Sequence, residues 1–176
     1  MTYAMTETLD EHPAQRLTLA TSAHFDGLVA ALEQAVPALS DPEALRRLAE
    51  DGDWAAFVRG LAWESPSGFV RVATSRPSDL LQHAGSRSSC IVWSLAHHAI
   101  AARMIRHDPS TMLHSPLRLA AYTTGSPGTT LSLEVPSSSL GGFGLAKIAQ
   151  AGAELDRALG DLLEDLGLPR PAALRR

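Results

Sequence analysis

Two hydrophobic periods divide the chain into short extended segments and longer helical ones. Where apolar side chains recur at every second position, or fill a short run bounded by turn residues, the pattern predicts a strand. Where they recur at every third or fourth position, it predicts a helix with one buried face. On this basis strands are predicted at residues 16–22, 68–75, 88–95, 116–124 and 129–136, and helices at residues 25–36, 41–50, 54–63, 77–84, 96–108 and 145–166.

Residues that cap helices support these boundaries. Asp41 stands before Pro42, which suits the first position of a helix, and Asp53 can accept a hydrogen bond at the start of the helix that follows it. Gly167 and Pro169 end the last predicted helix.

The order of these elements predicts an α+β fold, a mainly antiparallel sheet with helices packed on one face. The last two strands flank the turn residues "GSPG" and form a hairpin, so the strands do not simply alternate with crossover helices. The nearly all-apolar strand at 88–95 is expected to be central. No interior linker divides the chain, which predicts one globular domain over residues 15–169, with flexible tails at 1–14 and 170–176.

The hairpin pattern also predicts a register. If the apolar side chains of both strands face the core, Leu119 can lie opposite Leu133, and Arg118 then lies opposite Glu134 on the other face of the sheet. This pair is either a solvated ion pair, which contributes little to stability, or a pair of polar anchors for a ligand. The exposure of Arg118 separates the two interpretations.

Composition limits the classes of protein to which the chain can belong. With 176 residues, of which 45% are apolar, it can bury a core without metal ions or disulfides. Its one cysteine, Cys90, excludes an intrachain disulfide and fits a reducing cytoplasm. The formal net charge of −4 argues against nucleic-acid binding, which needs clustered Lys and Arg. The acidic N-terminal segment is unlike an export signal, and no apolar run reaches the roughly 18 residues that span a membrane. A soluble cytoplasmic protein without nucleic-acid or membrane partners is expected.

The serine and glycine stretch "SSSLGGFG" at 137–144 suggests an anion site at the start of a helix. Its glycine spacing matches neither a phosphate-binding P-loop nor a dinucleotide-binding loop. Ser137 and Ser138 are therefore interpreted either as capping residues or as ligand-binding residues of a backbone anion site beside Arg118.

Histidines supply the other candidate chemistry. His97, His98 and His114 are candidate acids or bases together with Glu134. Adjacent histidines on a helix point about 100° apart, which makes His97 and His98 poor joint metal ligands, and no metal or cofactor is predicted. A serine hydrolase would need Ser137, a histidine and Glu134 to meet, but no nucleophile-elbow motif is present.

Three segments resemble the domain of unknown function 302 family. They are "HDPSTMLHSPLRLAAY" at 107–122, with an acidic-proline turn before a "PLR" strand, "LEVPSS" at 133–138, and the closing helix "FGLAKIAQAGAELDRAL" at 143–159. The resemblance implies a TATA-box-binding-protein-like α+β layer and a homodimer, but no established reaction. The residues that match the family motifs are Arg118, Glu134, Pro136 and Ser137.

Two features depart from the family pattern. His97 and His98 stand where the family often has Asn-Pro, and Leu133 replaces a common aromatic residue. A specialised pocket is one interpretation of these departures.

These observations lead to three hypotheses about function. The first is a cytoplasmic protein that binds a small, partly apolar, acidic ligand against the sheet, with Arg118 and Glu134 as polar anchors. The second is a cofactor-independent lyase, isomerase or cyclase of secondary metabolism, with Glu134 or a histidine as acid or base. The third is a dimerising partner protein with no ligand.

Overall fold

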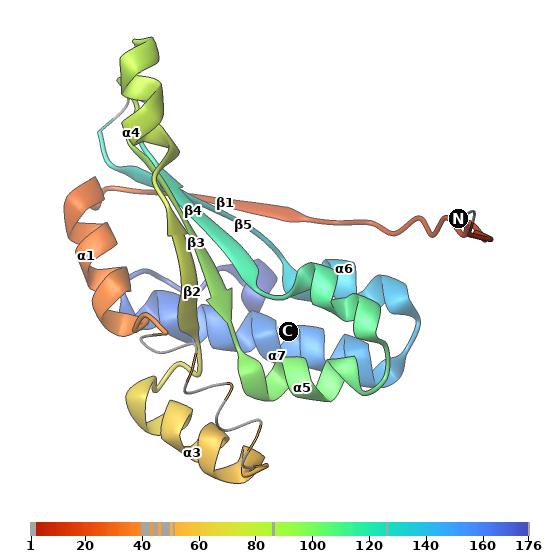
Figure 1. The fold of residues 1–176 in the computed structure, drawn as a ribbon. Helices are drawn as coiled ribbons and strands as arrows, with labels where there is room; N and C mark the ends of the chain where they lie inside the picture. Colours follow the sequence, from red (N-terminus) through yellow and green to blue (C-terminus); the bar gives the residue numbers. More distant parts are fainter. Residues whose placement is uncertain are drawn as a thin grey trace.

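The protein contains one five-stranded antiparallel sheet, seen in a computed structural model that describes residues 3–39, 43, 46, 50, 52–85, 87–125 and 127–175. Across the sheet the strands follow the order β1-β5-β4-β3-β2 (Figure 1). Their bounds are β1 (Arg16–Thr21), β2 (Val70–Ser75), β3 (Cys90–Ala96), β4 (Leu117–Tyr122) and β5 (Thr129–Glu134).

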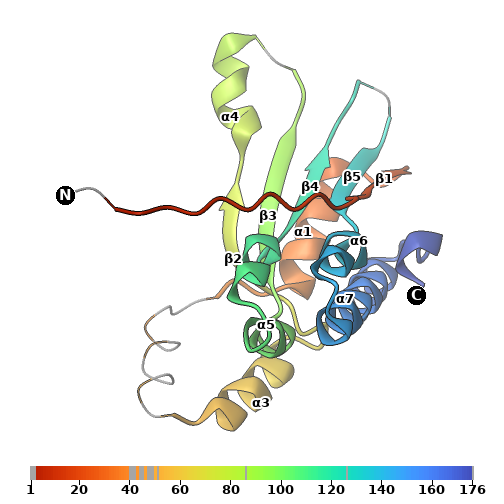
Figure 2. The same ribbon diagram turned by 90° about the vertical axis from the view of Figure 1, so that its right-hand side faces the viewer.

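Helices α1 and α7 cover one face of this sheet (Figures 1 and 2). The α-helices are α1 (Phe25–Ala35), α3 (Trp54–Glu64), α4 (Pro77–Leu81), α5 (His98–Ile105), α6 (Pro136–Leu140) and α7 (Ala146–Asp165). Short 3-10 helices are η1 (Gln82–Ala84), η2 (Pro109–His114), η3 (Gly141–Phe143) and η4 (Ala172–Leu174). None of these helices is long and apolar enough to cross a membrane.

The core lies between the sheet and these helices, where each strand contributes every second side chain. Leu119 on β4 and Leu133 on β5 face each other and are almost fully buried. On each strand, the residues next to these core positions point to the other face of the sheet, which is partly exposed. This confirms the predicted register, because a shift of one residue would turn the apolar side chains of one strand to the opposite face of the sheet from those of its partner.

The α+β fold with a mainly antiparallel sheet is confirmed. The apolar strand β3 lies between β2 and β4, but β4 is the middle strand of the five. The helix predicted at 41–50 rests on residues of which most lie outside the described ones.

The C-terminal segment is not a flexible tail, and that prediction is wrong. Leu174 in η4 is fully buried in the core, and Arg170 pairs with Asp161 and Glu164 on α7. The sequence signal at Gly167 and Pro169 marks the end of a helix, but it does not mark the end of the packed domain.

Candidate functional site

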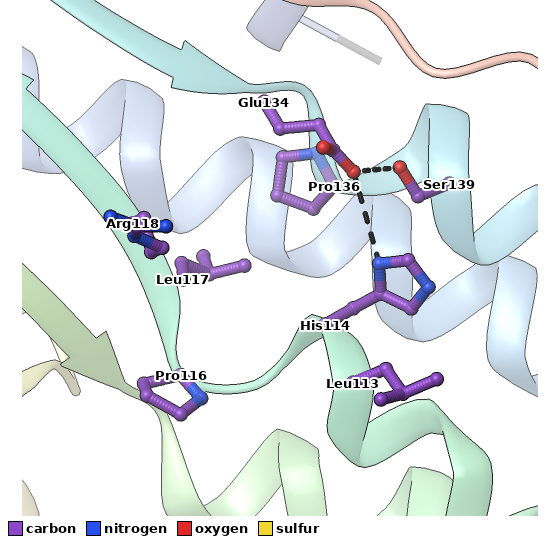
Figure 3. A pocket seen from close by; sticks show the side chains of 8 residues that line it. All are labelled: Leu113, His114, Pro116, Leu117, Arg118, Glu134, Pro136 and Ser139. Carbon is purple, nitrogen blue, oxygen red and sulfur yellow. Dashed lines mark hydrogen bonds and ion pairs between the residues drawn. The ribbon is translucent and has the colours of Figure 1, made fainter.

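A pocket of about 160 Å³ opens where β4 begins and β5 ends (Figure 3). Four apolar side chains and four polar ones line it. They come from η2, from the link into β4, from the ends of both strands and from α6. The lining residues are Leu113, His114, Pro116, Leu117, Arg118, Glu134, Pro136 and Ser139.

Local sequence explains how η2 brings His114 to this pocket. Asp108 caps η2 by accepting a hydrogen bond from the backbone N–H of Ser110 at 2.8 Å, and Pro109 occupies the first position of the helix. The hydrogen bonds from Ser110 lower the pKa of the Asp108 carboxyl. The acidic-proline turn is therefore the start of the 3-10 helix whose last residue is His114.

Glu134 is the centre of the polar contacts in the pocket. Its carboxylate accepts a hydrogen bond from the hydroxyl of Ser139, which is 1% exposed, and lies 3.8 Å from Nδ1 of His114. The Glu134 side chain is itself 53% exposed. Because α6 begins at Pro136, immediately after the strand, the chain turns and brings Ser139 back over Glu134 (Figure 3). One carboxylate oxygen is thus fixed by a buried donor while the side chain still faces the pocket.

Arg118 lies across the pocket from this cluster (Figure 3). It is exposed, and among the described residues its guanidinium joins neither Glu134 nor any other carboxylate in an ion pair. The predicted juxtaposition of Arg118 and Glu134 on one face is present, but no direct pair forms. Glu134 contacts His114 and Ser139 instead, which leaves the guanidinium of Arg118 available.

A shallower hollow of about 280 Å³ continues from Arg118 and Glu134 over the open face of the sheet. Its floor includes Ala120 and Ser132. The hydroxyl of Ser132 lies 3.1 Å from that of Tyr122. Small side chains on this face leave room for a ligand that extends from the pocket along the sheet.

Aromatic side chains hold the ring of His114 from two sides. Phe143 and His12 each contact it edge to face with ring centroids 5.8 Å apart. The side chain of His12 also lies over Gly142, where an added Cβ would come within 2.4 Å of the Cβ of His12. The segment before β1 is therefore part of the wall around His114.

Ser137 and Ser138 do not line the pocket. The backbone N–H of Ser137 donates to Oδ1 of Asp156, and the Ser138 hydroxyl donates to the carbonyl of Val135 and accepts from the N–H of Gln15. The predicted ligand-binding role of these two serines has no counterpart in this geometry. Ser139 lines the pocket, although the sequence patterns do not single it out. The phase of the short helix that begins at Pro136 decides which serine faces Glu134, and so short a helix leaves no periodic signal.

His97 and His98 lie away from the pocket. Nδ1 of His97 accepts a hydrogen bond from the N–H of Ile100 at 3.4 Å and caps α5, while His98 packs against Phe57 with its Nε2 buried and without a hydrogen bond. Burial lowers the pKa of both imidazoles. The structure brings neither of them near Glu134, so the four predicted catalytic residues do not form one cluster.

Metal binding and serine hydrolysis, which the sequence does not favour, can also be compared with this geometry. Within the described part of the chain, no group of three or more His, Cys, Asp or Glu side chains is placed to hold a metal ion. The hydroxyl of Ser137, the nucleophile that a serine hydrolase would need, is buried and has no hydrogen-bond partner among the described residues, so it does not join a histidine and Glu134 in a catalytic triad. Cys90 is partly buried on β3, and burial raises the pKa of its thiol.

Comparison with known proteins identifies the fold. No family model matches the chain, and no curated protein matches it. Among solved structures it is similar to an uncharacterized conserved protein, DUF302, from Bacillus stearothermophilus, with a TM-score of 0.61 and 14% sequence identity over 86% of this chain and 97% of that one. The resemblance to the domain of unknown function 302 family is confirmed at the level of the fold. That protein is itself described as uncharacterized, so the similarity gives no information about a reaction.

Proposed function

We propose that the protein binds a small ligand with an anionic group and an apolar part in the pocket between Arg118 and Glu134. The observation that carries this proposal is that the Arg118 guanidinium has no carboxylate partner among the described residues and lies at the edge of a pocket with apolar walls. A planar guanidinium binds carboxylate or phosphate groups through two parallel hydrogen bonds. Its partner in the bound state is therefore an oxyanion on the ligand.

The apolar part of the ligand is inferred from the walls. Leu113, Pro116, Leu117 and Pro136 surround the polar groups, and Leu113 is 86% exposed. Covering such a side chain with an apolar ligand removes its surface from water, which favours binding. Glu134 and His114 supply a fixed acceptor and an imidazole for a hydroxyl or amine of the ligand.

The resemblance stated above and the residue composition support two further proposals. We propose a cytoplasmic location, because a single cysteine fits a reducing compartment. We also propose a homodimer, which native mass spectrometry can measure in the experiment described next.

The test is native mass spectrometry of protein purified from its natural host, followed by calorimetry with a panel of small aromatic and aliphatic carboxylates. Arg118→Gln is expected to weaken binding about tenfold or more, because a charge-assisted bidentate contact is lost. Arg118→Lys keeps the charge but loses the planar fork, and an intermediate affinity is expected. The matched control is Arg59→Gln, which removes one exposed charge on α3. Unchanged affinity in Arg118→Gln, or no binding across the panel and no retained molecule, would contradict the proposal.

A second candidate function is supported by the contact between His114 and Glu134. An imidazole 3.8 Å from a carboxylate can transfer a proton to or from a substrate held by Arg118, as in a cofactor-independent lyase, isomerase or cyclase. Glu134→Gln keeps the size of the side chain but removes its basicity. If the protein is an enzyme, this variant purified from the natural host retains a molecule that differs from that retained by the wild type. The same retained molecule in both proteins supports binding alone.

A further inference from the structure

A second hollow, of about 200 Å³, lies between the C-terminal part of α5 and the first turns of α7. It shares no residue with the pocket at Arg118 and Glu134. Three of the seven side chains that line it are cationic, and a fourth is a histidine. The lining residues are Arg103, Arg106, His107, Lys147, Gln150, Ala151 and Glu154.

The one carboxylate in this hollow is already bonded. Glu154 accepts hydrogen bonds from both terminal nitrogens of Arg103, and Oε1 accepts a further one from Gln150 at 3.2 Å. These contacts hold the pKa of the Glu154 carboxyl below its usual value, chiefly through Arg103. Arg103 and Glu154 therefore neutralise each other.

Three cationic or titratable side chains remain without a carboxylate. Arg106, His107 and Lys147 are exposed and form no ion pair within the part of the chain that the structure describes. The protein as a whole is acidic, with a net charge of −4, yet these basic side chains lie together in one hollow. Like charges this close repel each other unless an anion lies between them. The N-terminal end of α7 carries the partial positive charge of the helix dipole, and no acidic residue in its first turn offsets this charge.

We propose that this hollow is a second binding site, for a small polyanion that carries phosphate groups. Arg106 supplies a planar fork and Lys147 a point charge, the two side chains that proteins use most often for phosphate. His107 adds an N–H donor, and Gln150 adds a neutral amide at the edge. Among the described residues, three basic groups without an ion pair lie at the end of α5 and the start of α7, and so small a group fits a small molecule better than the backbone of a nucleic acid, which extends over many phosphates.

Isothermal titration calorimetry with inorganic pyrophosphate at low ionic strength tests the proposal. The wild type is expected to bind one pyrophosphate per chain, with an affinity that falls as salt is added. The double variant Arg106→Gln/Lys147→Gln is expected to lose about tenfold or more in affinity. The matched control is Arg59→Gln/Arg87→Gln, which removes the same charge at exposed positions outside the hollow and should bind as the wild type does.

Two further measurements keep the outcome clear. The NMR signals of the His107 ring should move on titration of the wild type, and they should not move in the double variant Arg106→Gln/Lys147→Gln, which assigns the bound pyrophosphate to this hollow. The proposal is overturned if pyrophosphate does not bind at millimolar concentration. It is also overturned if both double variants lose the same affinity, because net charge alone would then explain binding.

Discussion

The buried hydroxyl of Ser139 donates a hydrogen bond to Glu134, five residues earlier in the chain. The bond links the end of β5 to α6 and fixes the carboxylate that faces His114. Because Ser139 is almost completely buried, its main role is to position Glu134.

Replacing Ser139 with alanine should therefore affect both stability and binding. A hydrogen bond to a half-exposed carboxylate contributes about 1 kcal/mol, and Ser139→Ala is expected to lower the free energy of unfolding by about that amount. Urea denaturation measures the change. A double-mutant cycle with Glu134→Ala isolates the pair, and a coupling energy of about 0.5–1 kcal/mol is expected. Strict additivity of the two single variants would show that the bond contributes nothing.

Close packing of α6 on α7 also positions the pocket. An added Cβ at Gly152 would lie 2.9 Å from the Cα of Ser137 and 3.2 Å from the Cβ of Leu140. Gly152→Ala should push α6 away from α7 and destabilise the fold by about 1–3 kcal/mol, despite the better helix propensity of alanine. The shift should also weaken ligand binding, because α6 carries Ser139 and Pro136 into the pocket. Urea denaturation and calorimetry measure the two effects.

Gly60 provides the matched control for this substitution. It lies within α3 and has open space where a Cβ would be added. Gly60→Ala is expected to stabilise the protein by about 0.5–1 kcal/mol through helix propensity alone. Equal effects at Gly60 and Gly152 would rule out the proposed contact between α6 and α7.

The register of the hairpin could be predicted because side chains alternate between the faces of a strand. Once Leu119 and Leu133 both face the core, their neighbours Arg118 and Glu134 must share the other face. The order of the strands in the sheet is harder to predict from the sequence. An apolar strand such as β3 is buried on one face and flanked on both sides, and that pattern does not distinguish second place from the middle of the sheet.

The candidate site was predicted in part for similar reasons. Which serine reaches Glu134 depends on the turn at Pro136 and on the phase of a five-residue helix, and neither leaves a periodic signal. Residue type alone groups His97 and His98 with Glu134. Their positions are set instead by contacts with Phe69 and Phe57, which lie far away in the sequence.

The same tryptophan substitution should have different effects in the core and on the surface. Trp93 is fully buried, and its Nε1–H donates to Oε1 of Glu33 at 3.2 Å, whereas Trp63 is 89% exposed. Trp93→Phe is expected to cost about 2–4 kcal/mol, because it leaves a cavity and removes the hydrogen bond to Glu33. Trp63→Phe should change stability by less than about 0.5 kcal/mol. Thermal and urea denaturation measure both, and similar losses in the two variants would contradict the assigned burial.

The pH dependence of stability should reflect the two histidines outside the pocket. Burial lowers the pKa of His97 and His98 below the ordinary value of 6.5, so below that pH the unfolded chain binds more protons than the folded one. The free energy of unfolding must then fall as the pH drops from about 7.5 to about 5.5, a range above the ordinary titration of carboxylates. His97→Asn keeps an acceptor at the cap of α5, and His98→Phe keeps a ring against Phe57, but neither new side chain titrates. Urea denaturation across this range should show a smaller fall in the double variant than in the wild type. If the two proteins lose the same stability, the burial of these imidazoles does not control the acid sensitivity of the fold.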